Sequence, residues 1–255
     1  MKNLTKLTLL FSTLILLTAC PKKEQMQSDH VNVYFIHSLD NLLIIKDSLL
    51  YTNEAGQLYS IKNLQYLISD IKLTDENGNT LQELASEHFV SSDDESTYKL
   101  YLSEILHTGE YANIEFTLGL DSSSNISNLY LNESYHTQMF WPDMMGGGYH
   151  YMKLEGAFNN DSSFYNIHTG ASMGNDYSIT KSFPINLTSI ENGKTHDITI
   201  NMKINNWFSN PNTIILSNDG IMGNMQYQIE LQQNGTEDVF DMIGGSQEIA
   251  FSINN

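Results

Sequence analysis

An alternation of apolar and polar side chains with a period of two residues runs through much of the chain. In VNVYFIH (31–37), Val31, Val33, Phe35 and His37 share one face of an extended strand, as the pleat of a β-strand requires. Turn sequences such as DENGN (75–79) and IENGK (190–194) interrupt the pattern. We therefore predict an all-β protein, most simply an antiparallel, immunoglobulin-like β-sandwich. Its expected strands include residues 98–106, 113–120, 149–156, 196–204 and 224–231.

Helical patterns are scarce, and we expect one or two short helices. Residues 60–73 fit either a helix or a capped turn that leads into a strand, YLISDIKL (66–73). Residues 125–140 are the better candidate for a short helix, with Asn125 or Ser127 as its N-cap.

The first twenty residues have the pattern of an export signal. Lys2 and Lys6 precede an apolar run that ends at Cys20 in LTAC, where the cysteine of a lipoprotein is lipidated after cleavage. The alternative is a transmembrane anchor, but an apolar core of roughly a dozen residues is short for a bilayer, which needs about 20. We predict a lipoprotein signal peptide with a lipidated Cys20 (1–20), a polar tether (21–30) and a single domain (31–255), attached to a membrane of the cell envelope.

Charge and cysteine content exclude several kinds of site. The chain has 12 Lys and 30 acidic residues, a net charge of −18, and no Arg, so we expect no nucleic-acid binding. Cys20 is the only cysteine, which leaves the exported chain without a thiol for a disulfide or a zinc–thiolate site. HExxH and phosphate-binding loop motifs are absent. We expect a protein that is not an enzyme.

The stretch MFWPDMMGGGYHYMKLEG (139–156) gathers residues that suit a soft metal ion. Met144 and Met145 lie between Trp141 and a run of three Gly, and thioether and imidazole groups favour Cu(I) over Ca²⁺ or Mg²⁺. His37 ends the apolar face of the first strand, and His168 precedes Gly170 at the end of another alternating run. Each feature also has a structural interpretation: the histidines as hydrogen-bonded turn residues, and the Met–Trp group as a plug at the end of the sandwich. His150, beside Met152 and Leu154, is interpreted as a histidine at the edge of the core.

Motifs that include YLISDIKL (66–73) and GGYHYMKLEG (147–156) resemble those of the MbnP-like family of copper-associated periplasmic proteins and lipoproteins. The resemblance extends over about residues 31–243, and YLISDIKL and GGYHYMKLEG are its more specific elements. The other stretches that carry it are FIHSLDNLLI, YTNEAGQLYSIKNLQ, MFWPDMMG, YNIHTGAS, INNWFSNP and GNMQYQIELQQNGTEDVF.

The resemblance implies a β-sandwich that binds copper outside the cytoplasm. In the family, Cu(I) is held by histidines together with a kynurenine, which a di-haem oxidase of the MauG type makes from a Trp. Here His168 matches the family's His-x-Gly motif, His37 matches a first-strand His, and Trp141 matches the Trp before the Gly–Tyr strand. The ligand set expected on this basis is His37, His168 and Trp141, the latter as kynurenine if oxidised, with Met144 or Met145 as an auxiliary donor.

This ligand set would make the chain a Cu(I) lipoprotein for uptake, storage or handover, with a di-haem oxidase and a copper-uptake receptor as partners. The alternative is a β-sandwich interaction module on the cell envelope that binds a protein or a glycan without metal. A Trp-x-His pair cannot be placed, because Pro142 and Asp143 follow Trp141.

Overall fold

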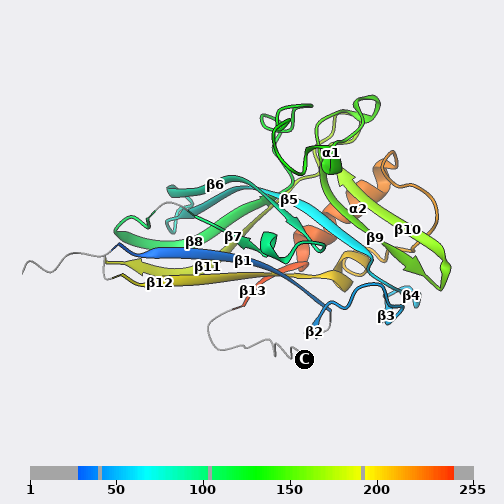
Figure 1. The fold of residues 1–255 in the computed structure, drawn as a ribbon, viewed down its shortest axis with the longest axis horizontal. Helices are drawn as coiled ribbons and strands as arrows, with labels where there is room; N and C mark the ends of the chain where they lie inside the picture. The colour runs from blue at the N-terminus through cyan, green and yellow to red at the C-terminus, as the bar shows by residue number, and fades with distance from the viewer. Residues whose placement is uncertain (1–27, 40–41, 103–104, 191–192, 244–255) are drawn as a thin grey trace, which may run out of the picture.

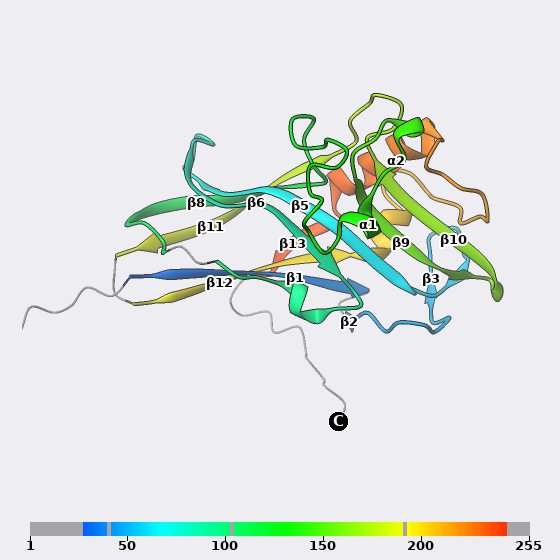
Figure 2. The ribbon, with the colours of Figure 1, turned by 45° about the horizontal axis from the view of Figure 1, so that its top comes forward.

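Two β-sheets pack face to face in a computed structural model of the chain. The structure describes residues 28–39, 42–102, 105–190 and 193–243. One sheet has five strands in the order β13-β12-β1-β2, with β7 also paired to β1. The other has eight in the order β11-β8-β5-β9-β4-β3, with β10 paired to β9 and β6 to β5. Figures 1 and 2 show the two layers, with β2, β3 and β4 at the end of the molecule opposite the start of β1.

The strands of the five-stranded sheet are β1 (His30–Leu39), β2 (Leu42–Leu43), β7 (Lys99–Leu100), β12 (Thr195–Lys203) and β13 (Phe240–Ile243). Those of the eight-stranded sheet are β3 (Tyr51–Thr52), β4 (Leu58–Tyr59), β5 (Asn63–Thr74), β6 (Thr80–Ser91), β8 (Gly109–Leu118), β9 (His150–Phe158), β10 (Asn160–Gly170) and β11 (Ile179–Ser189). The helices are η1 (Glu95–Tyr98), α1 (His136–Met139), η2 (Asp143–Met145), η3 (Ile204–Phe208) and α2 (Met225–Glu237).

The predicted antiparallel β-sandwich is confirmed, with one parallel pair. Strands β1 and β12 run parallel, with Phe35 opposite Ile200, whereas the other strand pairs are antiparallel. Alternation along β1 buries Val31, Val33, Phe35 and His37, as the period of two predicted.

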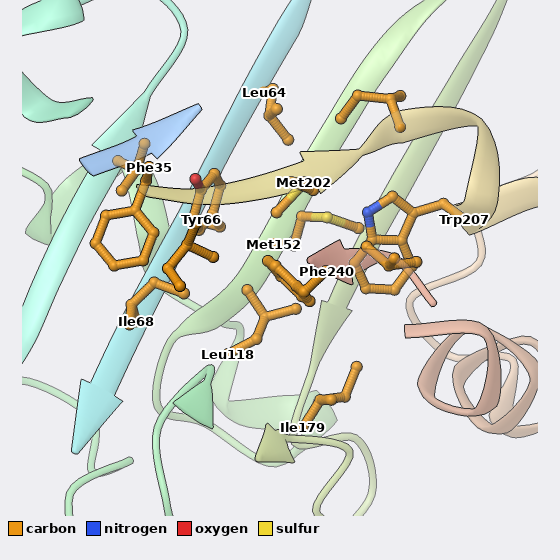
Figure 3. Close-up of a cluster of buried hydrophobic side chains, with 14 of the residues drawn as sticks. Phe35, Leu64, Tyr66, Ile68, Leu118, Met152, Ile179, Met202, Trp207 and Phe240 are labelled. Atoms are coloured by element: carbon orange, nitrogen blue, oxygen red, sulfur yellow. The ribbon is translucent and has the colours of Figure 1, made fainter. Parts of the chain in front are cut away.

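The core fills the space between the two sheets. Figure 3 shows Phe35, Met202 and Phe240 of the five-stranded sheet facing Tyr66 and Met152 of the eight-stranded sheet. Each of these side chains is at most 3% exposed. Burying a large apolar side chain stabilises a fold by about 1.5–3 kcal/mol, so this inter-sheet contact holds the two layers together.

A smaller cluster packs the long segment between β8 and β9, here called the excursion, against the outer face of the eight-stranded sheet. Leu67 of β5 and Tyr151 of β9 pack there with four residues of the segment between β8 and β9, namely Leu120, Tyr135, Met139 and Tyr149. Neighbouring residues Tyr66 and Ile68 belong to the inter-sheet core, because successive side chains of a strand point to opposite faces. The excursion therefore covers the sheet from outside.

Four local predictions need correction or resolution. Residues 60–73 form strand β5 from residue 63 on, and the helix expected over 125–140 is reduced to α1, His136–Met139. Among residues 98–102 and 105–106, the part of the predicted strand 98–106 that the structure describes, the strand is limited to β7, Lys99–Leu100. Residues 224–231, predicted as a strand, form the N-terminal part of helix α2, capped by the side chain of Asn224.

The predicted signal peptide, Cys20 and residues 21–27 of the predicted tether lie outside the described residues, as do residues 244–255 of the predicted domain. Within the described ranges, no helix has the length and apolar character needed to cross a bilayer.

Candidate metal centre

Two imidazole rings meet where β9 and β10 adjoin the excursion. His150 begins β9 and His168 lies near the end of β10, and their ring centroids are 5.0 Å apart. The pairing of the two strands shifts register between Thr169 and Gly170, so that His150 lies opposite Gly170. Bulges of this kind re-aim side chains and are frequent beside functional sites. The Trp141 ring also contacts His150, 4.8 Å away between centroids.

His150 has one ring nitrogen free to bind a ligand. Its Nδ1 lies 3.1 Å from the carbonyl oxygen of Met139, and because a carbonyl only accepts, Nδ1 carries the proton. The lone pair of the neutral ring is therefore on Nε2, which is buried and has no hydrogen-bond partner among the described residues. Burial lowers the pKa of His150 to about 3, so the ring is neutral at physiological pH, as a metal ligand must be.

A carboxylate fixes the orientation of His168. Its Nε2 lies 2.6 Å from Oε1 of Glu155, and the other carboxylate oxygen accepts a hydrogen bond of 3.1 Å from Asn63. The hydrogen bond from His168 is the largest cause that lowers the pKa of Glu155 to about 2, so Glu155 is ionised. With Nε2 as donor, the neutral ring has its lone pair on Nδ1. A carboxylate on the far nitrogen of a histidine is a common support for a metal ligand.

Helix α2 holds the backbone that carries His168. The Gln228 side chain is fully buried and donates a hydrogen bond of 2.8 Å to the carbonyl oxygen of His168. Its own oxygen accepts from the Gly170 N–H at 3.4 Å. Strand β10 pairs with β9, and Gln228 supplies hydrogen-bonding groups like those of a neighbouring strand.

Trp141 forms a tightly fitted wall of the site. Its indole is fully buried and lies against Gly170, where an added Cβ would be 2.7 Å from the ring. Its Nε1 donates a hydrogen bond of 3.3 Å to the Met145 carbonyl oxygen. Residues 146–148 follow with φ of 125°, 73° and 86°, a left-handed region that glycine adopts readily. The three glycines thus turn the chain from Trp141 back into β9.

The structure does not bring His37 and His168 together. His37 faces the inter-sheet core, where its Nε2 lies 2.9 Å from the Tyr66 hydroxyl, and desolvation lowers its pKa to about 3. Gln65, the neighbour of Tyr66 on β5, pairs with Lys153, which in turn pairs with His168. Because side chains alternate across a strand, His37 and His168 lie on opposite sides of the eight-stranded sheet.

The predicted methionine donors also lie away from the imidazole pair. Met144 is 88% exposed, and the end of the Met145 side chain lies close to Gly223. Sequence reasoning placed His168 and Trp141 in the site but assigned His150 to the core edge. The burial of His150 agrees with that interpretation, but its contacts with His168 and Trp141 depend on a bulge that strand periodicity does not reveal.

The residues present fit a soft ion of low coordination number. Within the described ranges, no group of three or more His, Cys, Asp or Glu could hold a metal. With metal–nitrogen bonds of about 2 Å, as for zinc, one ion can bridge two imidazoles at this separation. The unpaired Nε2 of His150 is the feature that most directly indicates such a ligand, since an orphan buried acceptor is costly.

These features define an all-β sandwich with a two-imidazole site at the junction of a strand pair and a covering excursion. The chain belongs to the MbnP family, because the MbnP family model matches residues 28–226. Its fold is similar to that of MbnP from Methylosinus trichosporium, with a TM-score of 0.51 at 12% identity, over 76% of this chain and 82% of that one. A comparison with curated proteins gives no match.

Proposed function

We propose that this chain is an extracytoplasmic lipoprotein, anchored through Cys20 in the cell envelope, which binds Cu(I) for uptake, storage or handover and is not an enzyme. Membership of the MbnP family supports the association with copper. The observation that carries the proposal is the free Nε2 of His150, in a ring 5.0 Å from that of His168.

In this proposal Nε2 of His150 and Nδ1 of His168 bind Cu(I). The Met139 carbonyl and the Glu155 carboxylate hold the protons on the opposite ring nitrogens, so that both lone pairs are available without a change of tautomer. Trp141 shields the pair from water on the side of His150. Kynurenine formed from Trp141 by a di-haem oxidase would add a nitrogen donor beside His150.

The test is a Cu(I) titration of residues 21–255 against a chromophoric chelator of known affinity, without oxygen. We expect His150→Ala and His168→Ala each to weaken binding by more than about 100-fold, since even residues that only support metal ligands contribute 10–100-fold. His107→Ala, at an exposed position, is the matched control and should bind as the parent does.

Unchanged affinity in both site variants would refute the proposed ligands, and a parent that binds no Cu(I) would favour an interaction module without metal. Co-expression with a di-haem oxidase tests the modification separately, through the mass of the peptide that contains Trp141.

A further inference from the structure

Five of the chain's eleven methionines lie in three segments: the short helix η2, the turn after β10, and the turn that leads into helix α2 together with its first residue. We name these residues the methionine rim: Met144, Met145, Met173, Met222 and Met225. Met144 is 88% exposed, Met173 61% and Met225 45%, while Met145 and Met222 are half-buried. Methionine is usually a core residue that fills irregular gaps, and packing does not account for thioethers as exposed as these.

Direct contacts join the three segments of the rim. The Met173 N–H donates a hydrogen bond of 2.8 Å to the carbonyl oxygen of Met145. The Ser172 hydroxyl donates one of 2.9 Å to the carbonyl oxygen of Met222. The methyl end of Met145 lies 3.4 Å from where a Cβ on Gly223 would be. Met145, Met173 and Met222 are therefore neighbours in space, although 77 residues separate the first from the last along the chain.

The rim adjoins the imidazole pair through Trp141. The Met145 carbonyl oxygen that accepts from Met173 also accepts from Nε1 of Trp141, and the Trp141 ring contacts His150 on the inner side. A single indole thus contacts both the Met145 backbone of the rim and the buried ring of His150.

The geometry points to a second soft-metal site on the methionine rim, at which the thioethers of Met145, Met173 and Met222 bind Cu(I) at the surface, next to the imidazole pair. Thioether sulfur is a soft, uncharged donor that selects Cu(I) over Ca²⁺, Mg²⁺ and Zn²⁺. The site binds more weakly than the imidazole pair because it lies at the surface, with Met173 61% exposed and Met145 and Met222 half-buried. Such a site suits an ion that arrives or leaves by ligand exchange. This inference shares the metal of the proposed function but does not require the imidazole pair to bind it.

The experiment measures the stoichiometry of Cu(I) on the full chain and identifies its ligands by X-ray absorption at the copper edge. Sulfur and nitrogen ligands differ in bond length, about 2.3 Å against 2.0 Å for zinc. The rim variant is Met145→Leu/Met173→Leu/Met222→Leu, which removes three sulfurs at nearly constant volume and so preserves the fold. Met242→Leu, at a half-buried position in β13, is the matched control.

We expect two equivalents of Cu(I) on the parent chain and on Met242→Leu, the weaker one bound by sulfur. The rim variant should lose the sulfur-bound equivalent and keep the nitrogen-bound one, while His150→Ala/His168→Ala should do the reverse. A parent that binds only a nitrogen-coordinated ion would overturn the rim site and leave the proposed function standing. Sulfur-bound copper alone would support the rim and refute the imidazole pair. A second equivalent that survives in the rim variant would also overturn the inference.

Discussion

Gly170→Ala adds one methyl group at the contact between β10 and Trp141. The new Cβ would lie 2.7 Å from Cε3 and 2.9 Å from Cζ3 of the indole, whereas carbon atoms pack best at roughly 3.5–4.0 Å. The ring must therefore retreat by about 1 Å. It is fully buried and hydrogen-bonded to the Met145 carbonyl, and retreat disturbs its contact with His150.

Overpacking of this kind destabilises a protein by about 1–3 kcal/mol. In a domain of this size each kcal/mol lowers Tm by about 2–4 °C, so we expect Tm to fall by roughly 2–12 °C. Cu(I) affinity should fall as well, because a displaced indole moves His150. Circular dichroism melts and the chelator titration measure the two effects.

Gly220→Ala is the matched control, since no atom lies within 4 Å of its added Cβ. It should leave both Tm and Cu(I) affinity unchanged. If Gly170→Ala behaves like Gly220→Ala in both assays, Trp141 does not pack on β10 as described, and the proposed wall of the metal site is wrong.

Two further predictions concern Glu155 and His37. Glu155→Gln should weaken Cu(I) binding by about 10–100-fold, because a Gln amide cannot accept from both His168 and Asn63; Glu110→Gln, at an exposed position, should have no effect in the same titration. His37 has a folded-state pKa of about 3 against 6.5 when unfolded, so the unfolded chain takes up a proton that the folded chain excludes. His37 should therefore lower the free energy of unfolding by up to about 1.4 kcal/mol per pH unit as pH falls from 6.5 towards 3. In urea melts from pH 7 to 4, His37→Leu/Tyr66→Phe should show a shallower decline, and a slope equal to that of the parent would contradict this role.

The period-two pattern revealed the strands whose two faces differ most in polarity. Strand β1 buries alternate side chains from Val31 to His37, and β8 and β12 show the same alternation over part of their length, so the pattern is visible in the sequence. Helix α2 was not predicted from the sequence because polar residues occupy its buried face: Gln228 and Asn234 are fully buried with Leu231. Gln228 bonds to the His168 carbonyl and Asn234 to that of Trp207. These partners are distant in the chain, so the period of the helix is hidden from a hydrophobicity pattern.

The sequence likewise predicted some features of the candidate site and missed others. Trp141 and His168 stood out from their residue types and neighbours, and the turn at Gly146–Gly148 could be anticipated because few other residues adopt positive φ. His150 and His37 have the same sequence signature, an imidazole on an apolar strand face. Only the bulge opposite Gly170 turns one towards His168, while the other remains against Tyr66 in the core.

The order of apolar and polar residues was enough to determine that this chain forms a β-sandwich. Each strand buries one of its faces, and this requirement leaves a period of two in the strand's own sequence. Which histidines meet, which nitrogen of each bears the proton, and which methionines gather at the surface were decided by tertiary structure. Those properties depend on contacts between residues far apart in the chain, and no segment of the sequence contains both partners of such a contact.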